Sequence, residues 1–296
     1  MSASNPPRRF APLSAAATGK SEVDGRMVLK GIVFDMDGTL SSETLPLPSH
    51  HLFLDPPSSN LEINGSAQLS SLSLASKGEP QNYMFGEMRS ALGITKSEDI
   101  LDHIYALPES EQDEAHAKIQ AIERRAMENQ VPQAGLVSLM EHLDARDVKK
   151  PSVRGISTIS PDGATNRLAL STPVTHLLST HLPGHISAFS PIITRDFRPP
   201  KPSPAGILHI AQAWGLISSS EISNEGRPIA KRAIPLIMVG DSVDDMEAGR
   251  EAGAATVLLR SEGKEELERD ERTDLVISRL DELIDILENG FEGRQG

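Results

Sequence analysis

Short apolar runs alternate along the chain with longer stretches in which apolar residues recur every three or four positions. A short run bounded by turn residues is typical of a buried strand, whereas the wider spacing is typical of a helix with one apolar face. Strands that alternate with helices predict a parallel sheet covered on both faces, and hence an α/β fold with three layers. The predicted strands cover residues 28–34, 153–159, 188–195, 235–241, 254–260 and 274–280.

Apolar residues three or four positions apart, the spacing typical of a helix, occur in much of the long interval between the first two of these strands. They also occur in the shorter intervals that follow. Residues 41–80 differ, because they are rich in Ser, Pro and Leu and have no regular period, which predicts an irregular insertion. The predicted helices of the first interval cover 81–94, 97–108, 111–130 and 133–147. Those of the later intervals cover 173–182, 203–215, 242–253 and 281–290.

The composition narrows the range of partners. The chain has 296 residues, of which 38 % are hydrophobic, and this is enough for one large or two modest domains. Its formal net charge of −13 repels polyanions, so we expect no nucleic-acid partner. No apolar run reaches the length of a membrane span, so we expect no membrane association. The absence of cysteine excludes disulfides and thiolate metal sites.

The N-terminal segment has a composition of its own. Residues 1–21 contain Arg8, Arg9 and Lys20 with several Ser and Ala, and no acidic residue. We predict that residues 1–26 form a disordered tail of a cytoplasmic protein. The alternative is a mitochondrial presequence, which has the same acid-poor composition, although prolines in this segment weaken an amphipathic helix.

Two aspartates end the first predicted strand, in the stretch GIVFDMDGTL. Asp35 and Asp37 therefore stand at the carboxyl end of a buried strand, where parallel sheets bind their ligands. Asp241 ends another predicted strand, and Asp245 follows it closely, so both belong to the same edge. Neighbouring carboxylates repel one another unless a cation lies between them, and Mg²⁺ suits oxygen ligands of this kind. We predict that these four residues form a Mg²⁺ site.

Other sites built from similar residues do not fit. In an EF-hand counted from Asp35, the Gly falls at the fourth position instead of the sixth, and Pro46 stands where Glu is required. The chain has neither a G-x-x-x-x-G-K-[ST] phosphate loop nor a G-x-S-x-G nucleophile elbow. We interpret Gly249 as a packing position and Gly253 as a helix C-cap, and not as parts of a dinucleotide-binding loop.

Three segments resemble motifs of the haloacid dehalogenase superfamily of phosphohydrolases. The stretch DMDGT at 35–39 is similar to the first motif of the family, D-x-D-G-T. Lys201, in the proline-rich stretch RPPKPSPAG before a predicted helix, resembles the third motif. The stretch GDSVDD at 240–245 resembles the fourth, G-D-x-x-x-D. The resemblance extends over residues 27–40 and 81–290.

The resemblance implies a domain organisation. Residues 27–40 and 149–290 would form a Rossmann-like core with a parallel sheet. Residues 81–148 would form a small helical cap inserted after the first strand. The second motif of the family is a Ser or Thr at the end of the second strand, and Thr158 is the preferred candidate by its position. Ser160 and Thr165 remain alternatives.

The resemblance also implies roles for the candidate residues. Asp35 would attack phosphorus, and Asp37 would protonate the leaving oxygen and later accept a proton from water. Thr158 and Lys201 would stabilise the transferring phosphoryl group. Mg²⁺ would be held by Asp35, the backbone carbonyl of Asp37 and Asp241.

Asp245 would orient the metal shell or the lysine. The expected function is therefore hydrolysis of a small phosphorylated metabolite through an aspartyl-phosphate. Two alternatives remain, a phosphomutase with the same core and a non-catalytic regulatory protein that binds phosphate or metal.

Overall fold

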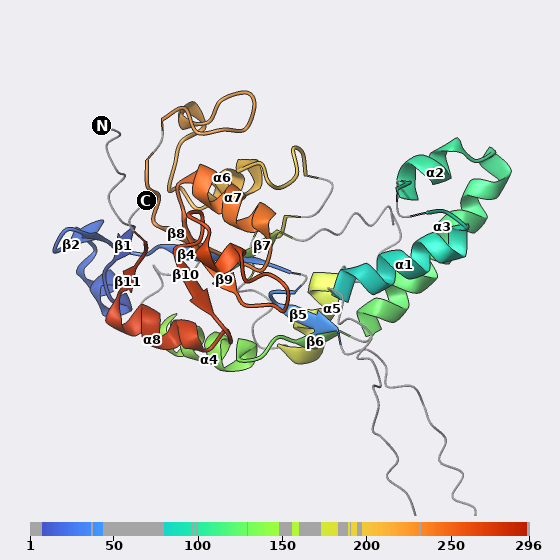
Figure 1. Ribbon diagram of the computed structural model, residues 1–296. Helices are drawn as coiled ribbons and strands as arrows, with labels where there is room; N and C mark the ends of the chain where they lie inside the picture. Colours follow the sequence, from blue (N-terminus) through green and yellow to red (C-terminus); the bar gives the residue numbers. More distant parts are fainter. Residues whose placement is uncertain are drawn as a thin grey trace, which may run out of the picture. The chain divides into compact units, whose positions relative to one another are not determined.

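The computed structural model divides the chain into two compact units, whose elements are drawn in Figure 1. The core unit comprises residues 1–42 and 130–296, and the helical unit comprises residues 43–129. The structure describes residues 8–36, 38–43, 80–95, 97–98, 100–128, 130–147, 156–159, 173–182, 189, 191–193, 197–230 and 232–294.

A parallel sheet of five strands forms the centre of the core unit, in the order β10-β9-β8-β4-β7 (Figure 1). Every residue of β4, β8 and β9 is buried, as expected for parallel strands covered on both faces. Phe34 of β4 lies opposite Val239 of β8, so the carboxyl ends of these strands meet at one edge of the sheet. The strands are β4 Gly31–Asp35, β7 Ile156–Ile159, β8 Leu236–Gly240, β9 Ala255–Leu259 and β10 Leu275–Ile277.

Helices cover both faces of this sheet, which confirms the predicted three-layer α/β fold. Because side chains alternate along a strand, Phe34 belongs to a core cluster with Leu139 and Leu283. Val33 belongs to the cluster on the opposite face, with Ile207 and Ala248. One helical layer consists of α4 Leu136–Asp147, α5 Pro173–His181 and α8 Glu282–Asn289. The other consists of α6 Ala205–Ala213 and α7 Val243–Ala252.

Three further predictions for the core unit concern a strand at 188–195 and the glycines Gly249 and Gly253. Of the strand predicted at 188–195, the structure describes residues 189 and 191–193, in which Phe189 and Ile193 each form a single β-bridge, so this strand stays a prediction. Gly249 is a packing position, because a Cβ there would lie 2.7 Å from the Thr256 methyl group. Gly253 caps α7 with a φ of +87°. Both glycine predictions are confirmed.

The N-terminal segment is part of the folded core unit. Phe10 is 1 % exposed, and its ring meets that of Phe291 edge-on with 5.5 Å between the centroids. The disordered tail predicted for residues 1–26 is therefore wrong for residues 8–26. Strands of two residues are too short to show a hydrophobic period, but their pairing buries apolar side chains. The elements are β1 Arg9–Phe10, the 3₁₀-helix η1 Leu13–Thr18, β2 Glu22–Val23, β3 Arg26–Met27 and β11 Phe291–Glu292, with strand order β11-β1-β3-β2.

The helical unit has a small apolar core of its own, in which Met88, Ile104 and Ile119 are buried. Its last residue is 129, so the boundary predicted at residue 148 is wrong. Helix α4 belongs to the core unit instead, because Leu139 packs in the same cluster as the central strand. The helices of this unit are α1 Pro80–Leu92, α2 Ile100–Ala106 and α3 Glu109–Glu128.

Two short strands pair where the chain leaves the core unit and returns to it. β5 Ser41–Glu43 and β6 Gln130–Pro132 form a two-stranded sheet. Next to it, the backbone N–H of Gln133 donates to the carbonyl oxygen of Leu40 at 2.9 Å. Most of the irregular insertion predicted at 41–80, from 44 to 79, lies outside the described residues. Within the described ranges, no helix combines the length and the apolar character needed to cross a lipid bilayer.

Candidate active site

Three aspartates converge at the carboxyl edge of the sheet. Asp35 ends β4, Asp241 directly follows β8, and Asp245 lies in the first turn of α7. One carboxylate oxygen from each lies within 4.8 Å of the other two. The exposed fractions of these residues are only 4 %, 9 % and 0 %. Because buried carboxylates repel one another and offer hard oxygen donors, the cluster fits a divalent cation such as Mg²⁺.

The side chain of Lys201 completes this cluster. The structure brings it from the loop before α6 to the sheet edge, where Nζ donates to Oδ1 of Asp35 at 2.5 Å. The same Nζ donates to Oδ1 of Asp245 at 2.6 Å. Burial lowers the pKa of Lys201, but Asp245 and Asp35 outweigh it and raise that pKa above its ordinary value. Lys201 therefore remains charged and offsets part of the negative charge of the site.

The start of helix α7 holds Asp245 in place. Its Oδ2 accepts hydrogen bonds from the backbone N–H of Ser242 at 3.1 Å and from the Ser242 hydroxyl at 2.6 Å. In return, the backbone N–H of Asp245 donates to Oγ of Ser242 at 3.3 Å, which completes a capping box. Both carboxylate oxygens of Asp245 therefore accept hydrogen bonds, Oδ2 from the start of α7 and Oδ1 from Lys201.

Two glycines allow these aspartates to approach. Gly38 has a φ of +80°, and a Cβ at this position would lie 2.6 Å from Oδ2 of Asp241. At Gly240, a Cβ would lie 2.4 Å from Cβ of Asp245. Any larger residue would push an aspartate away from its position. The packing role of Gly240 became visible only in the structure.

Asp241 has a lysine partner that the sequence analysis did not identify. Nζ of Lys264 donates to Oδ2 of Asp241 at 2.8 Å and to its backbone carbonyl oxygen at 2.9 Å. Burial raises the pKa of Asp241, Lys264 opposes that rise, and Asp245 adds to it. Lys264 lies in the polar stretch SEGKEEL, which has the composition of a solvated loop, and no spacing in the sequence relates it to Asp241.

The sequence matches a known family over most of its length. Residues 29–253 match the haloacid dehalogenase-like hydrolases. The chain belongs to this family of hydrolases. An uncharacterized hydrolase of Saccharomyces cerevisiae is 33 % identical over 271 residues, which cover 90 % of this chain and 94 % of the yeast protein.

Solved structures share the fold of this hydrolase at low sequence identity. A hydrolase from Pseudomonas syringae has a TM-score of 0.50 and 18 % identity, and the match covers 88 % of this chain and 98 % of that one. A protein from Lactobacillus plantarum, named provisionally as a phosphoglycolate phosphatase, has a TM-score of 0.50 and 13 % identity over 88 % and 100 % of the two chains. These likenesses support the Rossmann-like α/β fold of the core unit.

The structure describes only part of the other residues predicted for the hydrolase site. Asp37 lies outside the described residues, as do Ser160 and Thr165. Thr158 lies in β7 with its backbone opposite Phe34 of β4, one residue before the end of the strand. The carboxyl end of β7 therefore reaches the edge that carries Asp35, and the choice among the three second-motif candidates stays open.

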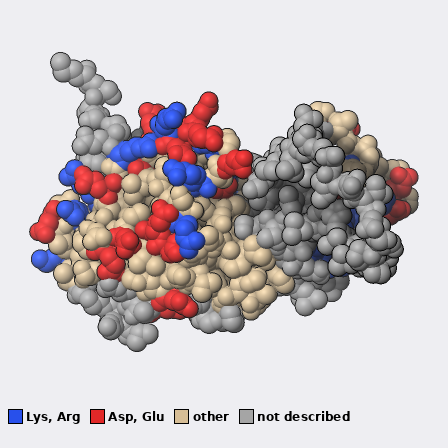
Figure 2. Space-filling model, turned by 60° about the horizontal axis from the view of Figure 1, so that its bottom comes forward, with Lys and Arg blue, Asp and Glu red and all other residues tan. Residues whose placement is uncertain are grey.

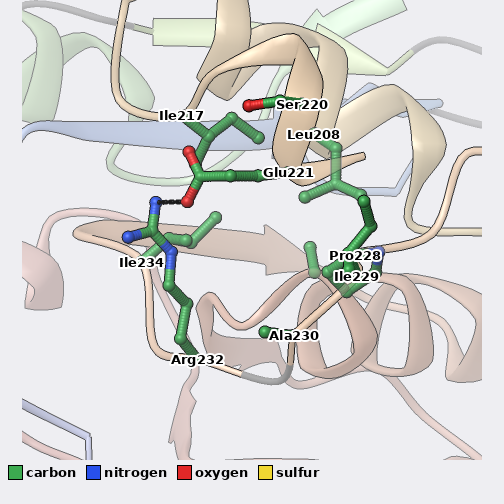
Figure 3. A pocket seen from close by; sticks show the side chains of 10 residues that line it. Leu208, Ile217, Ser220, Glu221, Pro228, Ile229, Ala230, Arg232 and Ile234 are labelled. Atoms are coloured by element: carbon green, nitrogen blue, oxygen red, sulfur yellow. Dashed lines mark ion pairs between the residues drawn. The ribbon is translucent and has the colours of Figure 1, made fainter. Parts of the chain in front are cut away.

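A pocket of about 120 Å³ lies elsewhere on the core unit (Figure 3). Its wall is largely apolar, and an ion pair between Arg232 and Glu221 crosses it with 2.6 Å between nitrogen and oxygen. Its lining includes none of the three clustered aspartates and neither of their lysine partners. The pocket is therefore separate from the candidate active site.

Acidic and basic side chains lie near one another on part of the described surface. On the face drawn in Figure 2, acidic and basic residues are interspersed over the described part of the surface. Several form ion pairs, such as Arg260 with Glu268 at 2.8 Å and Arg9 with Glu292 at 2.7 Å.

Proposed function

We propose that this hydrolase is a Mg²⁺-dependent phosphohydrolase that acts on a small phosphorylated metabolite through an aspartyl-phosphate at Asp35. One observation carries the proposal. The carboxylate of Asp35 is buried, hydrogen-bonded to Lys201, and grouped with Asp241 and Asp245. A carboxylate that ends a strand, with an ammonium group beside it, is suited to attack an electrophilic phosphorus atom.

The proposed reaction has two steps that share one acid–base residue. In the first step, a carboxylate oxygen of Asp35 forms a bond to phosphorus while the bond to the ester oxygen breaks. Asp37 gives its proton to that leaving oxygen. In the second step, water attacks the phosphorus of the aspartyl-phosphate, Asp37 takes a proton from the water, and Asp35 is released with inorganic phosphate.

The lysine and the second-motif residue would stabilise the charge that develops on phosphorus. Nζ of Lys201 is already bonded to the nucleophile, so its charge lies beside the position of the transferring group. Thr158, or one of its alternatives Ser160 and Thr165, would donate a hydrogen bond to a phosphoryl oxygen. Asp245 keeps the ammonium group of Lys201 in position through its own hydrogen bond.

The donor set at the sheet edge would hold the metal. Asp35 and Asp241 offer carboxylate oxygens, the backbone carbonyl of Asp37 is a further candidate, and Asp245 supports the shell. When bound, Mg²⁺ supplies positive charge that reduces the repulsion between an anionic nucleophile and an anionic ester. Its charge would also offset the repulsion among the three clustered carboxylates.

The net charge of the chain and the proposed role of the helical unit support a small phosphate ester as substrate. The net charge of −13 disfavours polyanionic substrates, whereas a small ester can be neutralised locally by Lys201 and the metal. We propose that residues 43–129 act as a cap that excludes water and contacts the part of the substrate beyond the phosphate. The Lactobacillus plantarum protein with this fold carries a provisional phosphatase name, which is the reaction class proposed here.

Hydrolysis of a chromogenic aryl phosphate tests the proposal. The wild-type chain should release the aryl alcohol with Mg²⁺ and lose this activity with a chelator, and Asp35→Asn should abolish it. Asp244→Asn is the matched control, because Asp244 is an exposed aspartate on the same turn of α7 as Asp245. Turnover without metal, or an active Asp35→Asn variant, would contradict the proposal. An isomerised sugar phosphate without free phosphate would indicate a mutase instead.

A further inference from the structure

Lys264 makes two hydrogen bonds to a single residue of the site. Its Nζ contacts both the carboxylate of Asp241, at 2.8 Å, and the backbone carbonyl of Asp241, at 2.9 Å. The side chain of Lys264 is 17 % exposed, which is unusual for a lysine in a polar loop. The ammonium group therefore belongs to the structure of the site and is not a solvated surface charge.

The loop that carries Lys264 is anchored to the core unit. Leu267, which begins the 3₁₀-helix η4 Leu267–Arg269, is 8 % exposed and packs with Met246 and Leu258. The backbone N–H of Leu267 donates to the carbonyl oxygen of Lys264 at 3.0 Å. Because a buried leucine fixes the turn, the position of Lys264 beside Asp241 is determined by the fold.

The two lysines divide the aspartates of the site between them. Lys201 is hydrogen-bonded to Asp35 and Asp245, and Lys264 is hydrogen-bonded to Asp241. Each of the three clustered carboxylates therefore has an ammonium partner within the chain. Oδ2 of Asp245 is bonded to the start of α7, whereas Oδ2 of Asp241 is bonded to Lys264, so a metal held by Asp241 would share this carboxylate with the lysine.

We propose that Lys264 is an internal counter-ion that competes with the divalent metal for Asp241 and thereby weakens metal binding. The inference rests on the proposed metal site and concerns what regulates its affinity. An ammonium group bonded to a ligand carboxylate repels a dication that approaches the same oxygens, and it occupies one of their lone pairs. Binding of the metal must therefore displace or weaken the contact between Lys264 and Asp241.

Lys264 also contributes in the opposite direction, because its two hydrogen bonds help to hold Asp241 in its orientation. Packing makes this contribution small. Asp241 directly follows the buried strand β8 and is 9 % exposed, and its carboxylate lies against Gly38, where even one added methyl group would clash. Since neighbouring backbone already confines Asp241, removal of Lys264 should change mainly the charge.

Calorimetric titration of the full chain with MgCl₂ tests the inference without measuring activity. We expect Lys264→Met to lower the Kd for Mg²⁺ at least about tenfold, because one positive charge next to the ligand oxygens is removed. Lys264→Arg keeps the charge and should stay within about twofold of the wild type. Lys20→Met removes one exposed positive charge from the core unit and controls for the change in net charge.

The outcomes separate this inference from the proposed function. A wild-type chain that binds no Mg²⁺, or whose binding survives Asp241→Asn, overturns the metal site and this inference together. A wild-type chain that binds Mg²⁺ at Asp241, with an equal or higher Kd in Lys264→Met, overturns the inference alone. Tightening in Lys264→Arg to the same degree as in Lys264→Met also overturns it. If the Met variant unfolds, Lys264→Gln replaces it, with the same expected decrease in Kd.

Discussion

Nζ of Lys201 lies 2.5 Å from Oδ1 of Asp35, although the two residues are 166 positions apart in the chain. Asp35 is carried by strand β4 of the parallel sheet, and Lys201 by the loop before α6. The contact can form only when this helix has packed on the sheet. The charge balance of the site therefore depends on the complete core unit, and the predictions below test this dependence.

Lys201→Met should reduce phosphate release at least about hundredfold, because a positioned donor near developing negative charge contributes roughly this much. Asp35 and Asp245 would also lose their shared partner, so the variant should unfold at a lower urea concentration in the absence of metal. Steady-state phosphate release and urea denaturation measure the two effects. Lys118→Met, in an exposed i,i+4 ion pair of α3, should change neither appreciably. Retention of most of the activity by Lys201→Met would contradict the assigned role.

Gly38→Ala should nearly abolish activity, because the new Cβ would collide with the carboxylate of Asp241. Gly215→Ala is a matched control, since Gly215 has a similar positive φ of +70° but no atom within 4 Å of the added Cβ. Both substitutions introduce backbone strain of about 1–3 kcal/mol, so both should lower the free energy of unfolding. Only the first should impair turnover, and equal loss of activity in both variants would argue against the steric explanation.

Phe10→Ala should lower the free energy of unfolding by about 3–5 kcal/mol, because it removes a large side chain that is 1 % exposed and packs on Phe291. Urea denaturation measures this difference. Ile229→Ala, at an apolar residue that is 66 % exposed, should change it by less than about 0.5 kcal/mol. An effect of Phe10→Ala as small as that of the control would mean that the N-terminal segment contributes little to the core.

Asp270→Asn should destabilise the protein more at neutral pH than in acid. Arg272 donates to both carboxylate oxygens of Asp270, at 2.8 Å and 2.7 Å, and lowers the pKa of Asp270 to about 2. Because the folded pKa lies below the unfolded pKa of about 3.9, the stabilisation is complete above the unfolded value and is lost as the pH falls towards 2. Urea denaturation at pH 7 and pH 3 should show a larger difference from the wild type at pH 7. An equal difference at both values would refute this linkage.

Much of the core could be predicted from the sequence because its strands are continuous apolar runs that end in charged residues. Asp35 and Asp241 stood out for this reason, and Lys201 stood out because of the prolines around it and the helix that follows. The spacing of apolar residues also indicated the helices on both faces. Local patterns of this kind predict helices and strands correctly because each element buries its own apolar side in the fold.

Other features could not be predicted, since they depend on contacts between distant segments. Lys264 has no local signal, and its role arises from a loop that Leu267 anchors on the core. The strand that contains Phe10 is two residues long, so only its partners β11 and β3 make it recognisable. The end of the helical unit was misplaced because α4 has the same apolar spacing as the helices before it, and only packing assigns it to the sheet.

The pairing of β5 with β6 bears on how such an enzyme can diversify. The chain departs from the central sheet through one of these strands and comes back through the other, so the base of the intervening segment is already closed. Lengthening a segment whose ends are held together adds little entropic cost. Natural selection can therefore exchange or enlarge whatever is inserted there, while the spacing of the side chains on the sheet is inherited unchanged.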